Sequence, residues 1–328
     1  MRAVVCVEHG PPGSLRVIER PDPVAVHGQV VVDVAFAAVN FPDVLIVADR
    51  YQVKVPTPFV PGSEFAGVVR AIGAGVDRVA VGDRVFGATM TGAYAEQVAV
   101  PAAALRPVPD GVGLDAAAAL WVAHATAYHA LRSIAEVTPG DRVVVLGAAG
   151  GVGLAAVELA AVMGADVIAA ASSAGKLALC RERGASHLID YVADDLRATL
   201  RALVPEGIDV VIDPVGGPLA EQALRALRWR GRFVTVGFAS GEIPRIPLNL
   251  VLLKGCVVKG FEIRTFSRFE PELAARDECE LLDLFASGQV VPHISAVHPL
   301  DDVAVALGDV AGRRSTGKVL LAPSAVGR

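Results

Sequence analysis

Short apolar runs alternate with segments of helical spacing through the middle of the chain. The apolar runs begin near residues 143, 167, 187, 209 and 232, and a further run covers residues 256–261. Alternation of this kind predicts strands joined by helices, and therefore an α/β domain built on a doubly wound parallel sheet. In such a sheet the ligand binds at the carboxyl ends of the strands. We assign this domain to residues 123–264.

The first 110 residues have a different pattern, in which many short β-branched runs are separated by glycine and proline. Short strands joined by frequent turns predict a compact, barrel-like β domain. After Arg264 the sequence predicts an acidic amphipathic helix over residues 271–287, a second helix, and a closing strand over residues 318–321. We expect these elements to return to the β domain, which would then comprise residues 1–122 and 265–328.

Composition and charge argue against several classes of protein. A chain of 328 residues exceeds one ordinary core, and a net charge of −5 with scattered Lys and Arg argues against a nucleic-acid surface. The N-terminus lacks the apolar region of a signal peptide, and charged residues interrupt the longest apolar stretch, residues 154–171. The four cysteines stand far apart without a C-x-x-C. We therefore expect a cytoplasmic enzyme that spans no membrane.

The strongest local signal is a glycine turn between an apolar run and an alanine-rich helix. Gly150, Gly151, Val152 and Gly153 form this turn. Backbone N–H groups and the partly positive N-terminus of a helix at such a turn bind the pyrophosphate of a dinucleotide, and Gly153 would let the helix lie close to the strand. Ala148 replaces the first glycine of the G-x-G-x-x-G pattern. The prediction therefore depends on the flanking strand and helix.

The end of the second strand of this domain indicates which dinucleotide binds. Ser172, Ser173 and Lys176 follow the strand, and no acidic residue precedes Glu182. An acidic residue here would bind the ribose 2′-hydroxyl of NAD, whereas hydroxyls and an ammonium favour the 2′-phosphate of NADP. Alternatively, the two serines cap the following helix and Lys176 is solvated. We favour NADPH.

Motifs spread over nearly the whole chain carry a resemblance to a known family. They are residues 38–44 (AVNFPDV), 61–69 (PGSEFAGVV), 81–85 (VGDRV), 126–131 (TAYHAL), 147–153 (GAAGGVG), 184–191 (GASHLIDY) and 316–319 (TGKV). In this order they resemble the zinc-independent, zeta-crystallin-like quinone oxidoreductases of the medium-chain dehydrogenase/reductase superfamily. The resemblance implies a GroES-like catalytic domain, a Rossmann domain, NADPH as the reductant and a homodimer.

Two departures from the wider superfamily bear on metal binding. Zinc-dependent members carry Gly-His-Glu where this chain has Gly62-Ser63-Glu64, and they supply a cysteine ligand near Val39-Asn40. A catalytic zinc needs three good protein ligands, which Glu64 alone cannot supply. We therefore expect no metal and give Glu64 a structural role.

The resemblance also implies catalytic residues. Asn40 and Tyr51 match polar positions around the nicotinamide and the substrate carbonyl, and Thr126 matches a position beside the nicotinamide, so that Asn40 and Thr126 would also contact the cofactor. An amide and a phenol in an apolar cleft can stabilise negative charge on an acceptor oxygen. Alternatively, Asn40 only caps its helix and Tyr51 packs under the proline-rich segment, residues 55–62.

Further cofactor contacts follow from the same resemblance. Tyr191 and Arg313 match positions that contact the 2′-phosphate, and Gly237 and Phe238 lie where backbone groups hold the carboxamide. The predicted activity is hydride transfer from NADPH to a quinone or a similar conjugated carbonyl. Two alternatives are a reductase of α,β-unsaturated ketones or enoyl thioesters, and a non-catalytic NADPH-binding protein of the crystallin type.

The last strand of the α/β domain suggests an assembly. Residues Lys254 to Gly260 predict a strand at the edge of the sheet, and exposed edge strands tend to be paired or covered. We expect this edge to pair with its copy in a homodimer. Glu262 and Arg264 follow, and their role stays open: they could form an ion pair at the cleft or at the joint between the domains.

Overall fold

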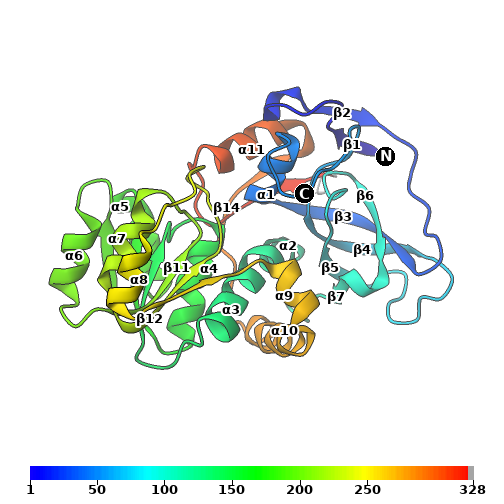
Figure 1. Ribbon diagram of the computed structural model, residues 1–328. Coiled ribbons are helices and arrows are strands. Elements are labelled where there is room, and N and C mark those ends of the chain that lie inside the picture. Colours follow the sequence, from blue (N-terminus) through cyan, green and yellow to red (C-terminus); the bar gives the residue numbers. More distant parts are fainter. Residues whose placement is uncertain (324–328) are drawn as a thin grey trace. The chain divides into compact units, whose positions relative to one another are not determined.

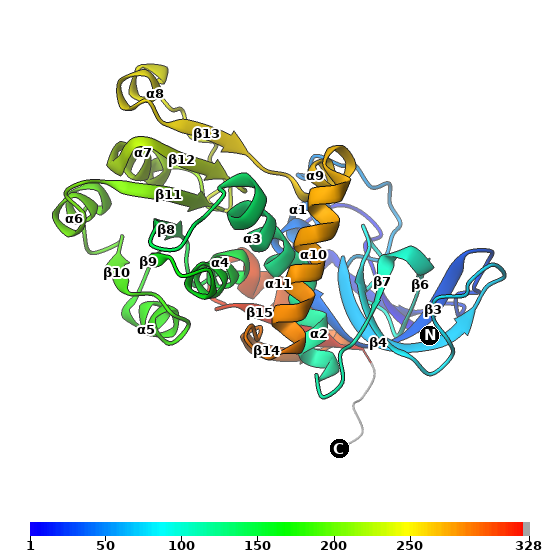
Figure 2. The same cartoon turned by 90° about the horizontal axis from the view of Figure 1, so that it is seen from below.

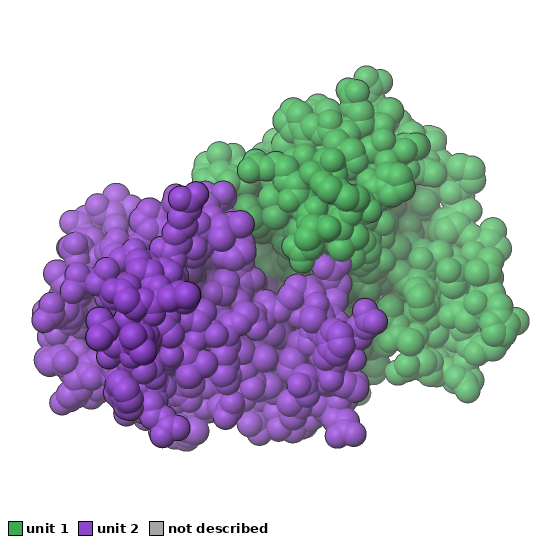
Figure 3. Space-filling model, viewed as in Figure 1, with its two compact units in different colours: residues 1–122, 291–328 green, residues 123–290 purple. Residues whose placement is uncertain are grey.

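The computed structural model of the chain describes residues 1–323 and divides into two compact units (Figure 3). One unit comprises residues 1–122 and the segment from Val291 onward, and the other comprises residues 123–290. Residues 265–290 are therefore part of the second unit, whereas the sequence pattern assigned them to the first. Residues 324–328, the end of the expected first domain, lie outside the described part.

The first unit is built on two sheets, in agreement with the β-rich pattern of its sequence (Figure 1). β1 (Arg2–Val5) and β2 (Arg16–Glu19) form an antiparallel pair. The larger sheet has the order β14-β15-β3-β4-β5-β7, and β6 also pairs with β3. Its strands are β3 (Gln29–Val39), β4 (Glu64–Ile72), β5 (Arg84–Ala88), β6 (Gln97–Pro101), β7 (Leu105–Pro107), β14 (Ile294–Pro299) and β15 (Lys318–Ala322). We did not predict β14.

The core of the first unit lies against β3. Val30, Val32 and Val34 alternate along this strand and join one apolar cluster, as a strand with period two requires. Val303 and Leu307 of α11 pack into the same cluster. The helical segments of the unit are η1 (Pro12–Ser14), α1 (Phe41–Val47), η2 (Ala102–Ala104), α2 (Leu114–Leu120), η5 (Leu300–Asp302) and α11 (Val303–Ala311).

The second unit contains a six-stranded parallel sheet with the order β10-β9-β8-β11-β12-β13, which confirms the predicted doubly wound fold. Its strands are β8 (Arg142–Leu146), β9 (Asp166–Ala171), β10 (His187–Asp190), β11 (Ile208–Asp213), β12 (Leu227–Thr235) and β13 (Val257–Gly260). The strand order reverses between β8 and β11. The carboxyl ends of these two strands therefore mark the place where ligands bind in such sheets.

Helices cover both faces of this sheet (Figure 2). α4 and α5 lie on one face, and α6 and α7 lie on the other. The helices that connect the strands are α4 (Gly151–Val162), α5 (Ala174–Glu182), α6 (Leu196–Leu203), α7 (Pro218–Ala226) and α8 (Leu248–Lys254). β13 is the last strand of the described sheet, so the prediction of an edge strand is confirmed.

The helical segment over residues 121–134 is not a regular α-helix. It consists of a π-helical segment η3 (Trp121–Ala125), one turn of α-helix α3 (Thr126–His129) and a second π-helical segment η4 (Ala130–Ile134). The N–H of Val122 donates to the Glu64 carboxylate (2.7 Å), and the N–H of Ala135 donates to the carbonyl of Ala130. Both contacts depart from the α-helical pattern and have no signature in the local sequence. π-Turns of this kind are frequent at functional sites.

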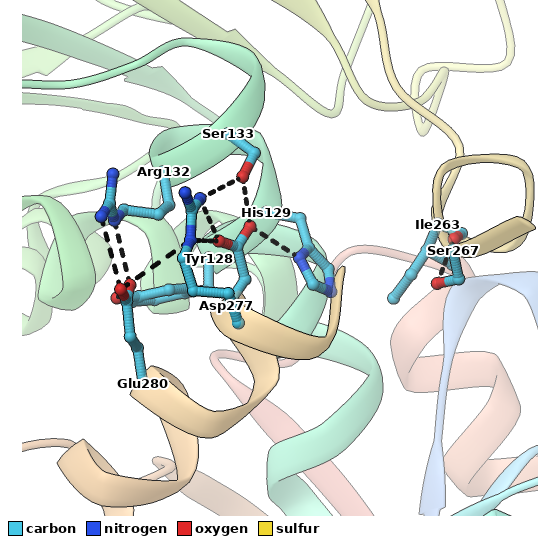
Figure 4. Close-up of polar contacts among 9 residues, drawn as sticks. Tyr128, His129, Arg132, Ser133, Ile263, Ser267, Asp277 and Glu280 are labelled. Carbon is cyan, nitrogen blue, oxygen red and sulfur yellow. Dashed lines mark hydrogen bonds and ion pairs between the residues drawn. The ribbon is translucent and has the colours of Figure 1, made fainter. Parts of the chain in front are cut away.

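A buried carboxylate explains why α10 (Pro271–Ala286) belongs to the second unit (Figure 4). Asp277 Oδ2 accepts a hydrogen bond from the Ser133 hydroxyl (2.6 Å) and lies 3.0 Å from Nδ1 of His129. Burial opposes ionisation of Asp277, but the hydrogen bonds from His129, Ser133 and Arg276 outweigh it and lower the pKa of the carboxyl. Glu280 adds contacts to the hydroxyl of Tyr128 and the guanidinium of Arg132. These bonds fasten α10 to α3 and η4.

Asp277→Asn is expected to lower the free energy of unfolding by about 2–3 kcal/mol, because it removes charge-assisted hydrogen bonds from a buried site. Urea denaturation of the two proteins measures the difference. Asp283→Asn, on the exposed side of α10, is the matched control and should change stability by no more than about 0.5 kcal/mol. Equal effects of the two substitutions would contradict the role of Asp277.

Glu262 and Arg264 form an ion pair, and the Glu262 carboxylate also caps a helix. The Glu262 carboxylate accepts the backbone N–H groups of Arg264 and Thr265 at the start of α9 (Ile263–Phe269), and the Arg264 guanidinium lies 2.9 Å from the same carboxylate. Burial opposes ionisation, but the hydrogen bonds from Thr265 and Arg264 outweigh it and lower the pKa of Glu262. Glu262 therefore begins α9, a helix that the sequence pattern did not predict.

Candidate functional site

The glycine turn lies at the carboxyl end of β8, next to the reversal of strand order. Gly147 has a φ of 59°, in the left-handed region, whereas Gly150 is extended and precedes α4. The glycine that the turn requires is thus Gly147, and Ala148 beside it is unstrained. The replacement that made the motif match imperfect therefore has no cost in the backbone.

The N-terminus of α4 presents backbone donors without a side chain over them. Gly150 stands at the N-cap and has no side chain that could cap the helix. Gly151 and Val152 begin the helix, and its first turn contains no acidic residue. A Cβ on Gly153 would clash with the carbonyl oxygen of Gly147, so only glycine fits there. This result confirms that Gly153 lets the helix lie close to the preceding turn.

The structure brings three of the predicted phosphate-binding residues together at the ends of β9 and β10. The Lys176 ammonium donates to the Ser172 hydroxyl (3.2 Å), and the N–H of Tyr191 donates to the carbonyl of Ala171, the last residue of β9. Ser173 stands at the N-cap of α5, but its side chain makes no capping hydrogen bond. The alternative in which this serine serves as a cap therefore gains no support.

A buried carboxyl that sequence analysis missed organises the neighbouring loops. Asp213 ends β11, and its Oδ1 accepts the N–H groups of Val215 and Gly216 (both 2.8 Å). Its backbone carbonyl accepts the N–H of Gly237 (3.3 Å). Burial raises the pKa of the Asp213 carboxyl. The only sequence signal is an acidic residue at the end of an apolar strand, before Pro-Val-Gly-Gly.

Phe238 is held against the same loop. A Cβ on Gly216, whose φ is 69°, would lie 2.9 Å from the Phe238 ring and from the carbonyl oxygen of Glu242. Glycine is therefore required where the chain after β11 meets the chain after β12. Asp213 and Gly216 together fix the loop that carries Gly237 and Phe238.

In the first unit, Asn40 is part of a buried ionic network. Its Oδ1 accepts a hydrogen bond from the Lys318 ammonium (2.5 Å), and its Nδ2 donates to Glu64 Oε2 (3.0 Å). Lys318 also donates to Glu64 Oε2 (2.9 Å). The structural role expected for Glu64 is confirmed, because this buried carboxylate of β4 binds Asn40 at the start of α1 and Lys318 at the start of β15. The amide of Asn40, however, already donates within the protein.

Lys318 is the second residue that sequence analysis missed. It lies at the start of β15, is 3% exposed and balances the charge of Glu64. The signals available were its place in the TGKV motif and a lysine opening an otherwise apolar strand. Neither identifies its partners, because Asn40 is 278 positions away.

A second branch of this network runs through α1. Asp43 Oδ2 accepts the hydroxyl of Tyr94 (2.7 Å) and the backbone N–H of Asn40 (2.9 Å). Burial raises the pKa of Asp43 to about 6, although the hydrogen bonds from Tyr94 and Asn40 and the Lys318 charge favour the carboxylate. Asn40 therefore does begin α1, through its backbone, while its side chain joins Glu64 and Lys318.

Three further residues predicted for the site, Tyr51, Thr126 and Arg313, are divided between the two units. Tyr51 is half-buried and packs against an apolar cluster that includes Phe59 of the proline-rich segment, as the structural alternative predicted. Thr126 is half-buried at the start of α3, between the two π-helical segments. Arg313 is exposed after α11, with a φ of 55°. Tyr51 and Arg313 belong to the first unit and Thr126 to the second.

We next ask whether the side chains and backbone groups of the candidate site suit a metal ion or a dinucleotide. The described residues contain no group of three His, Cys, Asp or Glu side chains placed to hold a metal ion. The glycine turn fits a pyrophosphate, because a side chain at Gly153 is sterically forbidden and the first N–H groups of α4 have no side-chain cap.

Within residues 1–323, no helix is both long and apolar enough to cross a membrane.

Comparisons with known proteins agree with this geometry. A family model described as alcohol dehydrogenase GroES-like domain matches residues 26–110, and one described as zinc-binding dehydrogenase matches residues 151–277. The chain is 39% identical to a quinone oxidoreductase-like protein 2 homolog of Nematostella vectensis, over 98% of this chain and 88% of the relative.

Solved structures show the same relationship along the whole chain. Quinone oxidoreductase of Escherichia coli complexed with NADPH has a TM-score of 0.92 and 28% identity, covering 98% of this chain and 100% of that one. Quinone oxidoreductase of Thermus thermophilus, also known in complex with NADPH, has a TM-score of 0.86 and 33% identity with the same coverage. The protein is an oxidoreductase of the medium-chain dehydrogenase/reductase superfamily, with a GroES-like unit and a Rossmann unit.

Proposed function

We propose that this protein is an NADPH-dependent reductase that transfers a hydride to a quinone or a similar conjugated carbonyl acceptor, without a metal. The observation that carries the proposal is the group formed by Ser172, Lys176 and Tyr191 beside a glycine turn shaped for a pyrophosphate. Hydroxyls and an ammonium suit a 2′-phosphate, and an acidic residue is missing from the position that NAD-binding units use. The NADPH complexes of two structural relatives support the choice.

Each part of the proposed cofactor site has a distinct task. The N-terminus of α4, from Gly150 to Gly153, would bind the pyrophosphate, and Ser172, Ser173, Lys176, Tyr191 and Arg313 would hold the 2′-phosphate. Gly237 and Phe238 would hold the carboxamide through their backbone, in a loop that Asp213 fixes. A reduced nicotinamide supplies a hydride when bound. The protein then contributes chiefly proximity and orientation.

Asn40, Tyr51 and Thr126 remain our candidates for the residues beside the nicotinamide and the acceptor. The structure changes the task proposed for Asn40, because Glu64 and Lys318 engage both ends of its amide. We therefore infer that Asn40 shapes the pocket and orients its neighbours. Tyr51 remains the candidate that donates to an acceptor oxygen.

The function is tested by an NADPH-oxidation screen across quinones, enones and enoyl thioesters, repeated with Tyr51→Phe. We expect turnover with quinones, and a loss of about tenfold or more in kcat when the phenol is removed, since an oxyanion donor acts in the transition state. Preferred turnover of a thioester would replace the proposal by enoyl reduction. Tight NADPH binding with no turnover of any acceptor would indicate a non-catalytic NADPH-binding protein.

Nucleotide preference gives a direct prediction for the end of β9. Ser172→Asp should raise the Kd for NADPH by about 100-fold and leave that for NADH within a few fold, because a carboxylate repels the 2′-phosphate. Fluorescence titration of both nucleotides measures the ratio. Ser172→Ala, which removes the hydroxyl without adding charge, is the control and should weaken NADPH binding much less. Equal or tighter binding of NADH by the wild-type protein would contradict the NADPH assignment.

We also propose that the protein forms a homodimer through β13, the edge strand of the parallel sheet in the second unit. Val257 and Val258 of β13 are exposed, as are Leu252, Leu253 and the nearby Trp229. An edge strand with exposed apolar side chains is suited to pairing with another chain. Val258→Lys would place two like charges close together in an antiparallel pair of these strands and should raise the dimer Kd at least about tenfold. Sedimentation measures this shift, and a wild-type protein that is monomeric at micromolar concentration would contradict the proposal.

A further inference from the structure

A single carboxylate lies in the helix that begins at the glycine turn. Glu158 is the one charged residue of α4, whose other residues are all glycine, alanine, valine or leucine. Its side chain is 13% exposed, and the residues on either side of it, Val157 and Leu159, are buried. A carboxylate in such surroundings is costly unless polar partners satisfy it. The partners of Glu158 therefore indicate what the residue does.

Both oxygens of Glu158 have a partner, and the two partners lie on different elements. Oε1 accepts a hydrogen bond from the guanidinium of Arg183 (3.1 Å), the residue that ends α5. Oε2 lies 3.3 Å from Nε2 of His124, in the π-helical segment η3. Because a carboxylate only accepts hydrogen bonds, Nε2 of His124 is the donor. Glu158 thus links α4 to α5 and to η3.

The contact between α4 and α5 is also secured by close packing. Gly184 follows Arg183 with a φ of 103°, and a Cβ at this position would lie 2.6 Å from the Cβ of Ala161 on α4. A joint packed this closely holds its shape without a directional bond. The guanidinium of Arg183 chiefly balances the charge of Glu158, which a buried carboxylate requires.

The contact between α4 and η3 depends more on the hydrogen bond itself. The side chain of His124 is 4% exposed, and its Nδ1 has no hydrogen-bond partner among residues 1–323. In this part of the chain the bond to Glu158 is therefore the one hydrogen bond of the ring. π-Helical turns are rare and short. Glu158 fixes the orientation of the one side chain through which this irregular turn hydrogen-bonds to α4.

The two elements that Glu158 links both belong to the proposed cofactor site. Thr126, the candidate beside the nicotinamide, begins α3 two positions after His124. α3 packs beside α4 (Figure 2). The N-terminus of α4, from Gly150 to Gly153, would bind the pyrophosphate. The link between His124 and Glu158 therefore joins the candidate nicotinamide residue to the helix that would bind the phosphates.

We propose that Glu158 is a positioning residue: by holding His124, it fixes Thr126 relative to the N-terminus of α4 and thereby sets where the nicotinamide ring lies. This role rests on the proposed reductase function and on the place proposed for Thr126. The pyrophosphate would fix the cofactor at α4, and Thr126 would contact the ring. A misplacement of about 1 Å can lower a rate roughly 100-fold, so the spacing of the two contacts bears directly on hydride transfer.

Substitutions at the two ends of the link test this role. His124→Leu and Glu158→Leu should each lower the rate of NADPH oxidation in a single turnover about 30-fold, because the ring is misplaced. The Kd for NADPH should change less than about threefold, since the phosphate-binding groups keep their places. His124→Gln keeps an N–H donor and should retain at least about half of the wild-type rate. Glu182→Leu, at an exposed position of α5, is the matched control and should leave the rate unchanged. A single turnover is used because product release can limit kcat.

A double variant separates positioning from stability. Each single substitution leaves a buried polar group without its partner and should lower the midpoint of urea unfolding. In His124→Leu/Glu158→Leu the two apolar side chains can pack together, so the midpoint should return toward that of the wild type. The single-turnover rate should stay low, because the directional bond is still missing. A double variant with the wild-type rate would show that packing alone matters and would overturn the proposal.

The position of the ring can also be observed without an acceptor. The fluorescence of bound NADPH depends on the surroundings of its nicotinamide, so the emission maximum should differ between the complexes of the wild type and His124→Leu, and Glu182→Leu should match the wild type. Identical emission in all three complexes would overturn the proposal. Single variants with wild-type rates on an active wild type would overturn the positioning role alone. A wild type that reduces no acceptor would overturn the proposed function as well, and the two failures are thus distinguishable.

Discussion

Replacement of Lys318 by methionine is expected to lower the free energy of unfolding by about 3–5 kcal/mol, the usual cost of breaking a buried ion pair. Lys318 and Glu64 are 3% and 0% exposed, and the ammonium also satisfies Asn40 Oδ1. Its loss leaves a carboxylate and an amide oxygen buried without their partner. Chemical denaturation measures the difference.

The control for this prediction is an exposed ion pair in the same unit. Lys54→Met removes a salt bridge to Asp49 whose side chains are largely in solvent, and it should cost no more than about 1 kcal/mol. The double variant Lys318→Met/Glu64→Gln removes both charges and should recover at least about 1.5 kcal/mol relative to additivity. Additive costs would show that Lys318 and Glu64 do not depend on each other.

Lys318 also shows where sequence analysis reached its limit. Period-two and helical patterns depend on neighbours a few positions apart, and they predicted the parallel sheet, the β-rich unit and the glycine turn correctly. The ionic network joins the N-cap of α1, β4 and β15, and Lys318 lies more than 250 positions from both Asn40 and Glu64 in the sequence. A charged residue that opens an apolar strand has the same local pattern whether it is solvated or buried against a partner.

The same limit explains the assignment of residues 265–290. The amphipathic pattern of α10 was predicted, but its acidic residues gave no sign that one of them is buried. Asp277 is 0% exposed, and its carboxylate binds Ser133 and His129, which lie outside α10. These partners fix α10 to the second unit, and only the folded chain brings them together.

The glycine turn was predicted in position but not in detail. The pattern required a glycine at position 148, whereas the left-handed residue is Gly147. A motif defined by spacing cannot register this shift of one position, because the backbone angle and not the residue type is what the turn requires. The apparent mismatch at Ala148 disappears once the angle is known.

Gly153→Ala is expected to raise the Kd for NADPH at least about 100-fold and to destabilise the second unit by about 2–3 kcal/mol, as an overpacked site does. The new Cβ would clash with the carbonyl of Gly147 and with the backbone of Ala148, so α4 must move away from the turn. Both the packing of the helix and the donors at its N-terminus are then displaced. Nucleotide titration and denaturation measure the two effects separately.

Gly150→Ala distinguishes these effects, because it changes the same turn without disturbing its packing. A Cβ there would meet only the carbonyl oxygen of Gly147, at 3.4 Å, and the φ of −77° suits alanine. We expect stability within about 0.5 kcal/mol of the wild type, together with weaker NADPH binding, because the methyl group would lie where the phosphate approaches. If Gly150→Ala bound NADPH normally while Gly153→Ala lost only stability, the turn would serve the packing of α4 on β8 and the pyrophosphate would have to bind elsewhere.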